Sequence, residues 1–226
     1  MISHRLINHM KSQHWTKVFI ELVIVVLGVF IGLQVDNWNQ MRQEQQHAAL
    51  LLNTLGTSMR HFDHTAAEMS KRITEGFAAF HQARARGEHP PPFFFRIPGS
   101  DTPPIAAWQA ALQSNLAELL PPRLMFDVGF FYSEQQGVGA KYVRYSRFVD
   151  REILPRLGNP ASFYDASGKL KPIYVQNMQR LREWNEYQKV LATSSRCLRK
   201  RFAHPKRAGE SCRPDYSVLK HLLRTP

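Results

Sequence analysis

The chain has 226 residues, of which 43% are hydrophobic and 21% charged, and 30 Lys and Arg against 18 Asp and Glu give it a net charge of +12. This length accommodates one folded domain with an appendage. The aromatic content of 11% excludes the composition typical of disordered chains. Two cysteines exclude a disulfide-dense miniprotein and a four-cysteine zinc fold, leaving room for one intramolecular disulfide.

An apolar stretch near the N-terminus is the strongest signal. Residues 18–35 read VFIELVIVVLGVFIGLQV, in which Glu21 and Gln34 are the strongly polar members. Trp15 and Trp38 bracket this stretch, and in a helix rising 1.5 Å per residue they lie roughly 34 Å apart. That length matches a hydrocarbon core of about 30 Å with Trp rings at both interfaces. We therefore predict a transmembrane helix over residues 15–38, with both Trp as interface anchors.

This helix is expected to be retained, because no small-x-small cleavage site of a secretory signal follows it. Arg5, Lys11 and Lys17 precede it, whereas Arg42 alone follows within about fifteen residues. The positive-inside rule then predicts a cytoplasmic tail over residues 1–14 and a C-terminal domain on the other side of the membrane. For a Gram-negative bacterium this means a single-pass protein of the inner membrane with a periplasmic C-terminal domain. No second apolar run is long enough to cross the bilayer again.

The membrane helix carries a face of small and polar residues. Gly28 and Gly32 have the spacing that allows two helix backbones to approach closely. Glu21 lies on the same face, and a charge in lipid is costly, so it is protonated, paired within an oligomer or extended to the interface. The face is either a homodimer seam or a reflection of how common Gly is in membrane helices. Its members are Glu21, Val25, Gly28, Gly32, Val35 and Asn39.

Residues 21–39 also follow the pattern E-x-x-x-V-V-x-G-x-x-I-x-L-Q-V-x-N-W-N. This opening resembles that of a family of small bacterial single-pass membrane proteins with a domain of unknown function. A weaker likeness lies at Ala107-Trp108 and Gln113-Ser114, although Asn115 stands where the family has Gly. The resemblance implies a membrane anchor with a helical extramembrane domain, and it supplies no catalytic residues.

A long amphipathic helix is predicted next, over residues 39–88 and continuous with the membrane helix. Its apolar residues recur at alternating steps of three and four, as in a heptad pattern. It is either a coiled-coil stalk or one helix of a monomeric bundle, and the scarcity of charge pairs flanking the stripe favours the bundle. The stripe consists of Leu52, Leu55, Met59, Phe62, Ala66, Met69, Ile73, Phe77 and Phe80.

A Pro-rich linker over residues 89–102 ends that helix. It contains Phe93-Phe94-Phe95, which we expect either to dock on the core or to form an exposed apolar patch. Asp101 or Thr102 is expected to cap the following helix, whose apolar stripe is Ile105, Trp108, Leu112, Leu116 and Leu119.

The remaining helices complete a bundle over residues 103–203. Pro121-Pro122 is expected to end one helix and open the next, Gly137 and Gly139 to interrupt it, and a last helix to run from Pro172 to Phe202. Since no sustained period-two alternation occurs, the predicted fold is all-α: a single transmembrane helix continuing into a long helix, followed by an antiparallel helical bundle.

The positive charge is concentrated toward the C-terminus, including a basic tail over residues 204–226. Residues 141–226 hold nineteen Lys and Arg against seven Asp and Glu. Cys197 and Cys212 bracket most of the densest part, and in an oxidising compartment they are expected to form a disulfide; the alternative is two thiols on a solvated basic tail. The densest residues are Arg196, Arg199, Lys200, Arg201, Lys206, Arg207 and Arg213.

No motif of a nucleotide-binding loop, an α/β-hydrolase, a zincin or a dithiol oxidoreductase occurs in the sequence. We therefore expect no enzyme activity, no cofactor and no metal; His61 and His64, with His47 or His81 near, are the best metal candidates, but such pairs are common by chance. The leading interpretation is an envelope interaction or scaffold protein, acting as an oligomer or as the partner of another envelope protein. The alternatives are binding of anionic lipid or lipopolysaccharide by the basic C-terminal region and, for a cytoplasmic domain, binding of nucleic acid, which the lack of aromatic stacking motifs disfavours.

Overall fold

The computed structural model of the protein describes residues 3–97, 105–114, 120–204 and 211–219. Its main helices are α1 (Ser3–Ala85), α2 (Ala106–Gln113), α4 (Pro122–Phe148) and α5 (Pro172–Phe202). Four short elements complete it: a π-helical turn η1 (Val149–Ile153) and the 3-10 turns η2 (Leu154–Arg156), η3 (Pro160–Phe163) and η4 (Tyr216–Leu219). The described residues contain no strand, only an isolated bridge between Tyr164 and Leu170. The predicted all-α class is confirmed.

The chain divides into two compact units, residues 1–50 and residues 51–226. In the first unit, every side chain from Lys17 to Gln46 is exposed. One helix of the described chain is long and apolar enough to cross a membrane, and its most apolar window is entirely unburied. This window has a mean hydropathy of 2.7, which comes from the stretch that the sequence predicted to be a membrane span.

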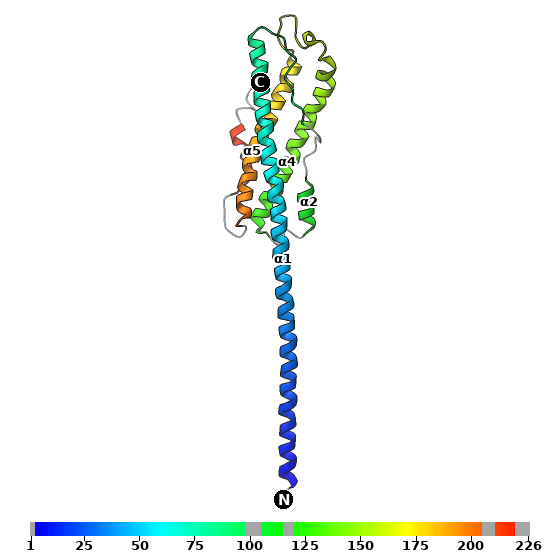
Figure 1. The fold of residues 1–226 in the computed structure, drawn as a ribbon, viewed down its shortest axis with the longest axis vertical. Helices are drawn as coiled ribbons and strands as arrows, with labels where there is room; N and C mark the ends of the chain where they lie inside the picture. The colour runs from blue at the N-terminus through cyan, green and yellow to red at the C-terminus, as the bar shows by residue number, and fades with distance from the viewer. Residues whose placement is uncertain (1–2, 98–104, 115–119, 205–210, 220–226) are drawn as a thin grey trace. The chain divides into compact units, whose positions relative to one another are not determined.

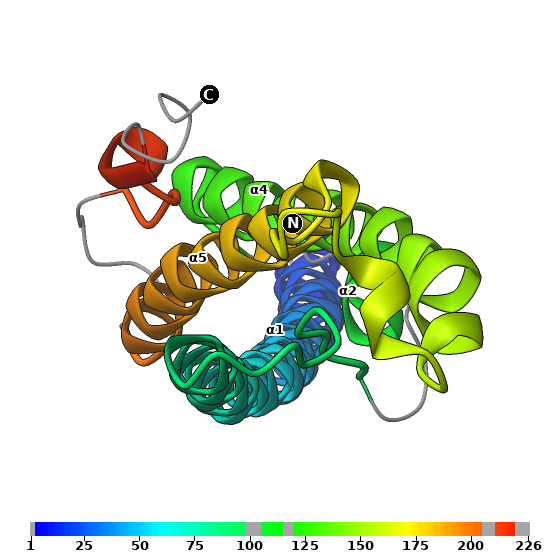
Figure 2. The same cartoon turned by 90° about the horizontal axis from the view of Figure 1, so that it is seen from above.

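The second unit is a bundle formed by α1 from Leu51 onward, α4 and α5 (Figures 1 and 2). Contacts with α5 set the helix directions. Asp63 on α1 contacts Arg196 while His81 contacts Arg182, so α1 and α5 are antiparallel. Asp127 on α4 likewise contacts Arg201, and Phe148 packs on Tyr174. Since α1 and α4 are both antiparallel to α5, they run in the same direction, and the chain must return along the bundle between them.

The core is built from heptad stripes on the three helices. The apolar stripe predicted on α1 supplies the fully buried Leu55, Met59 and Ile73. Pro122 occupies the first turn of α4, where its missing N–H costs nothing. A stripe of buried residues on α4, continued by Val149 of η1, then follows alternating steps of four and three: Leu124, Val128, Phe131, Gln135, Val138, Tyr142, Tyr145 and Val149. On α5 the corresponding set is Asn177, Leu181, Trp184, Gln188, Leu191, Ser195 and Leu198.

The interruption expected at Gly137 and Gly139 is wrong, because α4 continues through both. Each Gly costs a helix about 1 kcal/mol relative to Ala, whereas burial of one large apolar side chain contributes about 1.5–3 kcal/mol. Val138 and Tyr142 are 2% and 1% exposed. Packing of the stripe therefore outweighs the local preference of two glycines. The helix α4 ends at Phe148 and passes into η1 and η2.

The segment predicted as a linker is part of the fold. Residues 88–97, hereafter the return segment, contain no helix, and Phe93, Phe94 and Phe95 pack on the core, so the docking alternative holds. Phe93 packs edge-on against Phe77, with ring centroids 4.9 Å apart. Gly76 on α1 makes room for this ring, because a Cβ built there would meet Phe93 ring carbons at 2.0–2.9 Å.

Tyrosine hydroxyls satisfy the backbone of the return segment. The N–H of Phe95 donates to the Tyr145 hydroxyl at 2.9 Å and that of Ile97 to Tyr142 at 2.7 Å, both from α4. The Tyr164 hydroxyl donates to the Pro90 carbonyl at 2.5 Å. Burial raises the pKa of Tyr145 and, to a smaller degree, that of Tyr164. These phenols therefore stay neutral through the physiological pH range, so the Tyr164 hydroxyl keeps the proton that it donates to Pro90.

The predicted segment boundaries change accordingly. The bundle includes α1 from Leu51 and is not confined to residues 103–203. The caps Asp101 and Thr102, together with Leu116 and Leu119, lie outside the described residues. Within α2, Ala111 is buried and Leu112 is 50% exposed, so the predicted stripe is wrong at Leu112. Trp108 stacks on Tyr132 of α4 with ring centroids 5.2 Å apart, and Ala111 is the fully buried residue of this short helix.

We expect Gly76→Ala to lower the free energy of unfolding by about 1–3 kcal/mol, because the new methyl group overpacks against Phe93. The matched control is Gly137→Ala, where a Cβ meets nothing within 4 Å; it should be neutral or stabilising by up to about 1 kcal/mol. Urea unfolding followed by tryptophan fluorescence measures both. Equal stability of the two variants would contradict the docking of Phe93, and Phe93→Leu should recover part of the loss in Gly76→Ala.

Candidate functional site

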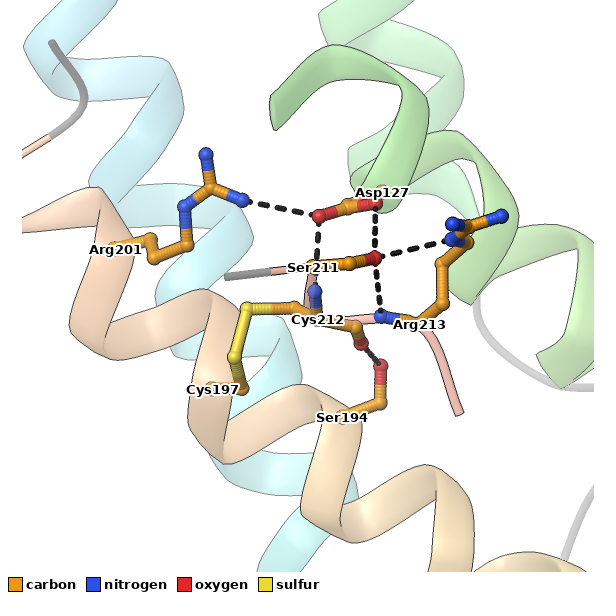
Figure 3. Close-up of a disulfide and its surroundings, with 7 residues drawn as sticks. All are labelled: Asp127, Ser194, Cys197, Arg201, Ser211, Cys212 and Arg213. Carbon is orange, nitrogen blue, oxygen red and sulfur yellow. Dashed lines mark hydrogen bonds and ion pairs between the residues drawn. A yellow bond between two sulfur atoms is a disulfide. The ribbon is translucent and has the colours of Figure 1, made fainter. Parts of the chain in front are cut away.

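The most connected polar cluster of the described chain gathers around Asp127 (Figure 3). This residue lies on α4 between the buried Leu124 and Val128 and is 1% exposed. Its Oδ2 accepts hydrogen bonds from the Arg201 guanidinium at 3.0 Å and from the Cys212 backbone N–H at 2.9 Å. Its Oδ1 accepts from the Ser211 hydroxyl at 3.1 Å. A buried carboxylate is tolerated when it is paired and hydrogen-bonded in this way.

A disulfide joins Cys197 on α5 to Cys212, closing a sequence separation of 15 (Figure 3). The Ser194 hydroxyl, one turn earlier on α5, donates to the Cys212 carbonyl. Cys212 is therefore held through its side chain, its N–H and its carbonyl, and it is 2% exposed. We call the set Asp127, Ser194, Cys197, Arg201, Ser211 and Cys212 the C-terminal clamp.

Beyond the C-terminal clamp, the last described residues also pack on the bundle. Tyr216 donates its hydroxyl proton to Glu134 of α4 at 2.5 Å, and its ring packs on Tyr187 of α5. Burial, with Glu134 as the second cause, raises the pKa of Tyr216, so the phenol remains the donor. Leu219 is 4% exposed. The predicted tail over residues 204–226 is thus partly a packed element, and only residues 211–219 of the segment after His204 are described.

The predicted basic patch is not a uniform cationic surface. Arg201 is engaged by Asp127, while Arg196 and Arg199 lie 2.5 Å and 3.6 Å from the two oxygens of Asp63 on α1. Lys200 is exposed. Arg213 donates to the Ser211 hydroxyl at 3.0 Å, and its guanidinium lies 5.7 Å from the centre of the Phe126 ring. Lys206 and Arg207 lie outside the described residues. Three of the predicted cations therefore join helices together instead of facing an anionic partner.

The residues predicted to anchor or pack the membrane helix are all exposed on the surface of α1. Trp15 and Trp38 are 75% and 58% exposed. Glu21 is exposed as well. A Cβ at Gly28 or Gly32 would meet nothing within 4 Å. The chain itself therefore leaves the face open to lipid or to a second helix.

A groove of about 300 Å³ forms at the other end of the bundle, between the last turns of α1 and the first turns of α5. Its apolar lining is Phe80, Leu170, Val175 and Met178, and its polar lining is His81, Arg84, Gln179 and Arg182. Neither Asp nor Glu is among these residues. A small, mostly apolar concavity with a few convergent polar groups is the usual form of a ligand site.

Metal ligation finds no support in the described residues, where no group of three or more His, Cys, Asp or Glu has the arrangement to hold an ion. His61 and His64 are exposed on α1. In the C-terminal clamp, the hydroxyls of Ser194 and Ser211 are engaged with the Cys212 carbonyl and Asp127. The arrangement of the clamp fixes a chain segment and presents no activated nucleophile.

Comparison of the chain with protein-family models, with curated proteins and with solved structures found no match in any of the three.

We expect Asp127→Asn to lower the free energy of unfolding by about 3–5 kcal/mol, because it leaves the largely buried Arg201 without its counter-charge. The control is Asp63→Asn, which weakens the contacts with Arg196 and Arg199, whose side chains are 49% and 28% exposed; it should cost less than Asp127→Asn, about 1 kcal/mol. Urea unfolding of both variants with the disulfide intact gives the comparison. Similar losses for the two variants would show that Asp127 does not anchor the C-terminal segment.

Proposed function

We propose that this protein is a single-pass membrane protein of the bacterial envelope whose helical domain acts by contact, as a scaffold or interaction partner. The observation that carries the proposal is the apolar stretch of α1, in which every side chain is exposed. Burial of one large apolar side chain contributes about 1.5–3 kcal/mol, so leaving the whole stretch in water would cost roughly 20 kcal/mol or more. A bilayer of matching thickness removes that cost. The likeness of residues 21–39 to the single-pass family supports the same conclusion.

The proposed orientation places the domain in the periplasm. Basic residues flank the apolar stretch mainly on its N-terminal side. The disulfide between Cys197 and Cys212 is consistent with an oxidising compartment, since such bonds are rare in the cytosol. These two arguments are independent of each other and favour the same side.

A contact role is favoured over binding of anionic lipid by the basic region. Arg196, Arg199 and Arg201 are committed to carboxylates of α1 and α4. A cation already paired within the fold has less to gain from a charged surface. The proposed contact is with a second copy, through the face that contains Glu21, Gly28 and Gly32, because small residues allow close helix packing in lipid.

Topology is tested with single reporter cysteines added to the chain with its disulfide intact. Gln136 is exposed on α4, and Ser12 lies in the predicted cytoplasmic tail. A membrane-impermeant maleimide should label Gln136→Cys in spheroplasts and Ser12→Cys only after lysis. The reverse pattern would overturn the orientation. Labelling of both in spheroplasts, or extraction of the protein from membranes by alkaline carbonate, would overturn the single-pass anchor.

Self-association is tested by Gly28→Ile with Gly32→Ile. In zwitterionic vesicles, energy transfer between labelled copies should report a dimer that weakens at least tenfold in this double variant, because Ile side chains separate the two backbones. In the described part of the chain, a Cβ added at either glycine meets nothing beyond its own helix within 4 Å, so the change reports contact between copies. The control, Val29→Ile with Leu33→Ile, changes the neighbouring positions off this face and should preserve the dimer. A monomeric wild type, or a dimer indifferent to both glycines, contradicts the seam.

A further inference from the structure

The groove between α1 and α5 combines apolar lining with two guanidinium groups. Val175, at 50% exposed, leaves part of the apolar lining open to solvent. Arg84 and Arg182 line the same concavity. Among the described residues neither of them forms an ion pair with a carboxylate, in contrast to Arg196 and Arg201 at the opposite end of the bundle.

Both arginines are positioned by contacts that leave donors available. Arg84 donates to the carbonyls of Glu88 at 2.9 Å and Gly168 at 2.8 Å, and its guanidinium lies 4.6 Å from the centre of the Tyr164 ring. Arg182 lies 4.4 Å from the centre of the Phe77 ring and donates to His81 Nε2 at 2.7 Å. A guanidinium carries five N–H donors. The contacts that position each arginine therefore use fewer than half of its donors.

His81 adds a further donor to this edge of the groove. A guanidinium only donates, so the contact with Arg182 requires Nε2 of His81 to accept, and the neutral ring then carries its proton on Nδ1. The polar lining is therefore rich in donors and cations and contains no carboxylate. Such a lining is complementary to an anion, and the planar fork of Arg matches a carboxylate in particular.

We propose that this groove binds a small monocarboxylate with a compact apolar body. The carboxylate is held by Arg182 and Arg84, and the body lies against Phe80, Val175 and Met178. A volume of about 300 Å³ is at the small end of ligand sites and suits one or two rings. The whole groove belongs to residues 51–226, so the inference does not depend on the proposed membrane anchor or its orientation.

The test uses the full chain in nanodiscs of zwitterionic lipid, titrated with 2-naphthoate and with its uncharged analogue 2-naphthamide. Ligand-observed NMR, with empty nanodiscs as the blank, measures both. For a ligand of this size we expect a Kd on the order of 1 mM for 2-naphthoate and binding at least tenfold weaker for 2-naphthamide. Equal affinity of the two compounds would overturn the role of the arginines, and no binding of 2-naphthoate would overturn the site.

Two substitutions at one exposed position separate charge from folding. Val175→Asp places a carboxylate in the groove and should abolish binding of 2-naphthoate, whereas Val175→Lys should retain it. Similar thermal unfolding of the two variants establishes that both are folded.

The arginine variants test the cation directly. Arg182→Gln should weaken binding about tenfold and Arg182→Lys less, while Arg196→Gln, at the other end of the bundle, should leave it unchanged. Equal binding by the Asp and Lys variants at position 175 contradicts the proposal.

Discussion

The fold depends on α1 carrying two different apolar patterns in one helix. Residues 18–35 are apolar around the whole circumference, which suits a lipid environment. From Leu52 onward the apolar residues are restricted to one stripe, which suits a helix packed on one side and solvated on the other. The change of pattern coincides with the division of the chain into units at residues 50 and 51. This change of pattern determines which part of α1 packs in the core of the bundle and which part is left to be buried by lipid or by another chain.

Because α1 and α4 run in the same direction, the chain must travel back along the bundle, and residues 88–97 do so without helical hydrogen bonds of their own. The hydroxyls of Tyr142, Tyr145 and Tyr164 replace some of these bonds. Asp127 performs a similar task for the segment that follows α5, since it binds the N–H of Cys212 and the hydroxyl of Ser211. In both places side chains from the rigid helices fix an irregular segment, as buried backbone groups require.

Local signals in the sequence predicted that the main helices exist and where two of them begin. Pro at the first turn sets the start of α4 and of α5, and α5 has the predicted bounds Pro172–Phe202. The return segment was misread as a linker because its hydrogen-bond partners lie 45 to 74 residues further along the chain. No local pattern reports such contacts. Asp127 did leave a signal that was missed, namely a lone carboxylate within the apolar stripe from Leu124 to Phe131. The groove left none, since its two arginines are 98 residues apart in the sequence.

The buried stripes of α4 and α5 contain polar residues at heptad positions where apolar ones would pack as well. Gln135 on α4 and Asn177 and Gln188 on α5 are each at most 7% exposed. Buried polar residues at such positions fix register and orientation in helical assemblies at a cost in stability. Here α5 is an antiparallel neighbour of both α1 and α4, so a uniformly apolar stripe would permit several registers. The ion pair of Asp127 with Arg201 acts in the same sense, because a shift of α5 by one turn would move Arg201 about 5.4 Å away from it. Register in turn aligns Arg182 with His81 and Arg201 with Asp127, so the groove at one end of the bundle and the clamp at the other both depend on how α5 is aligned with its neighbours.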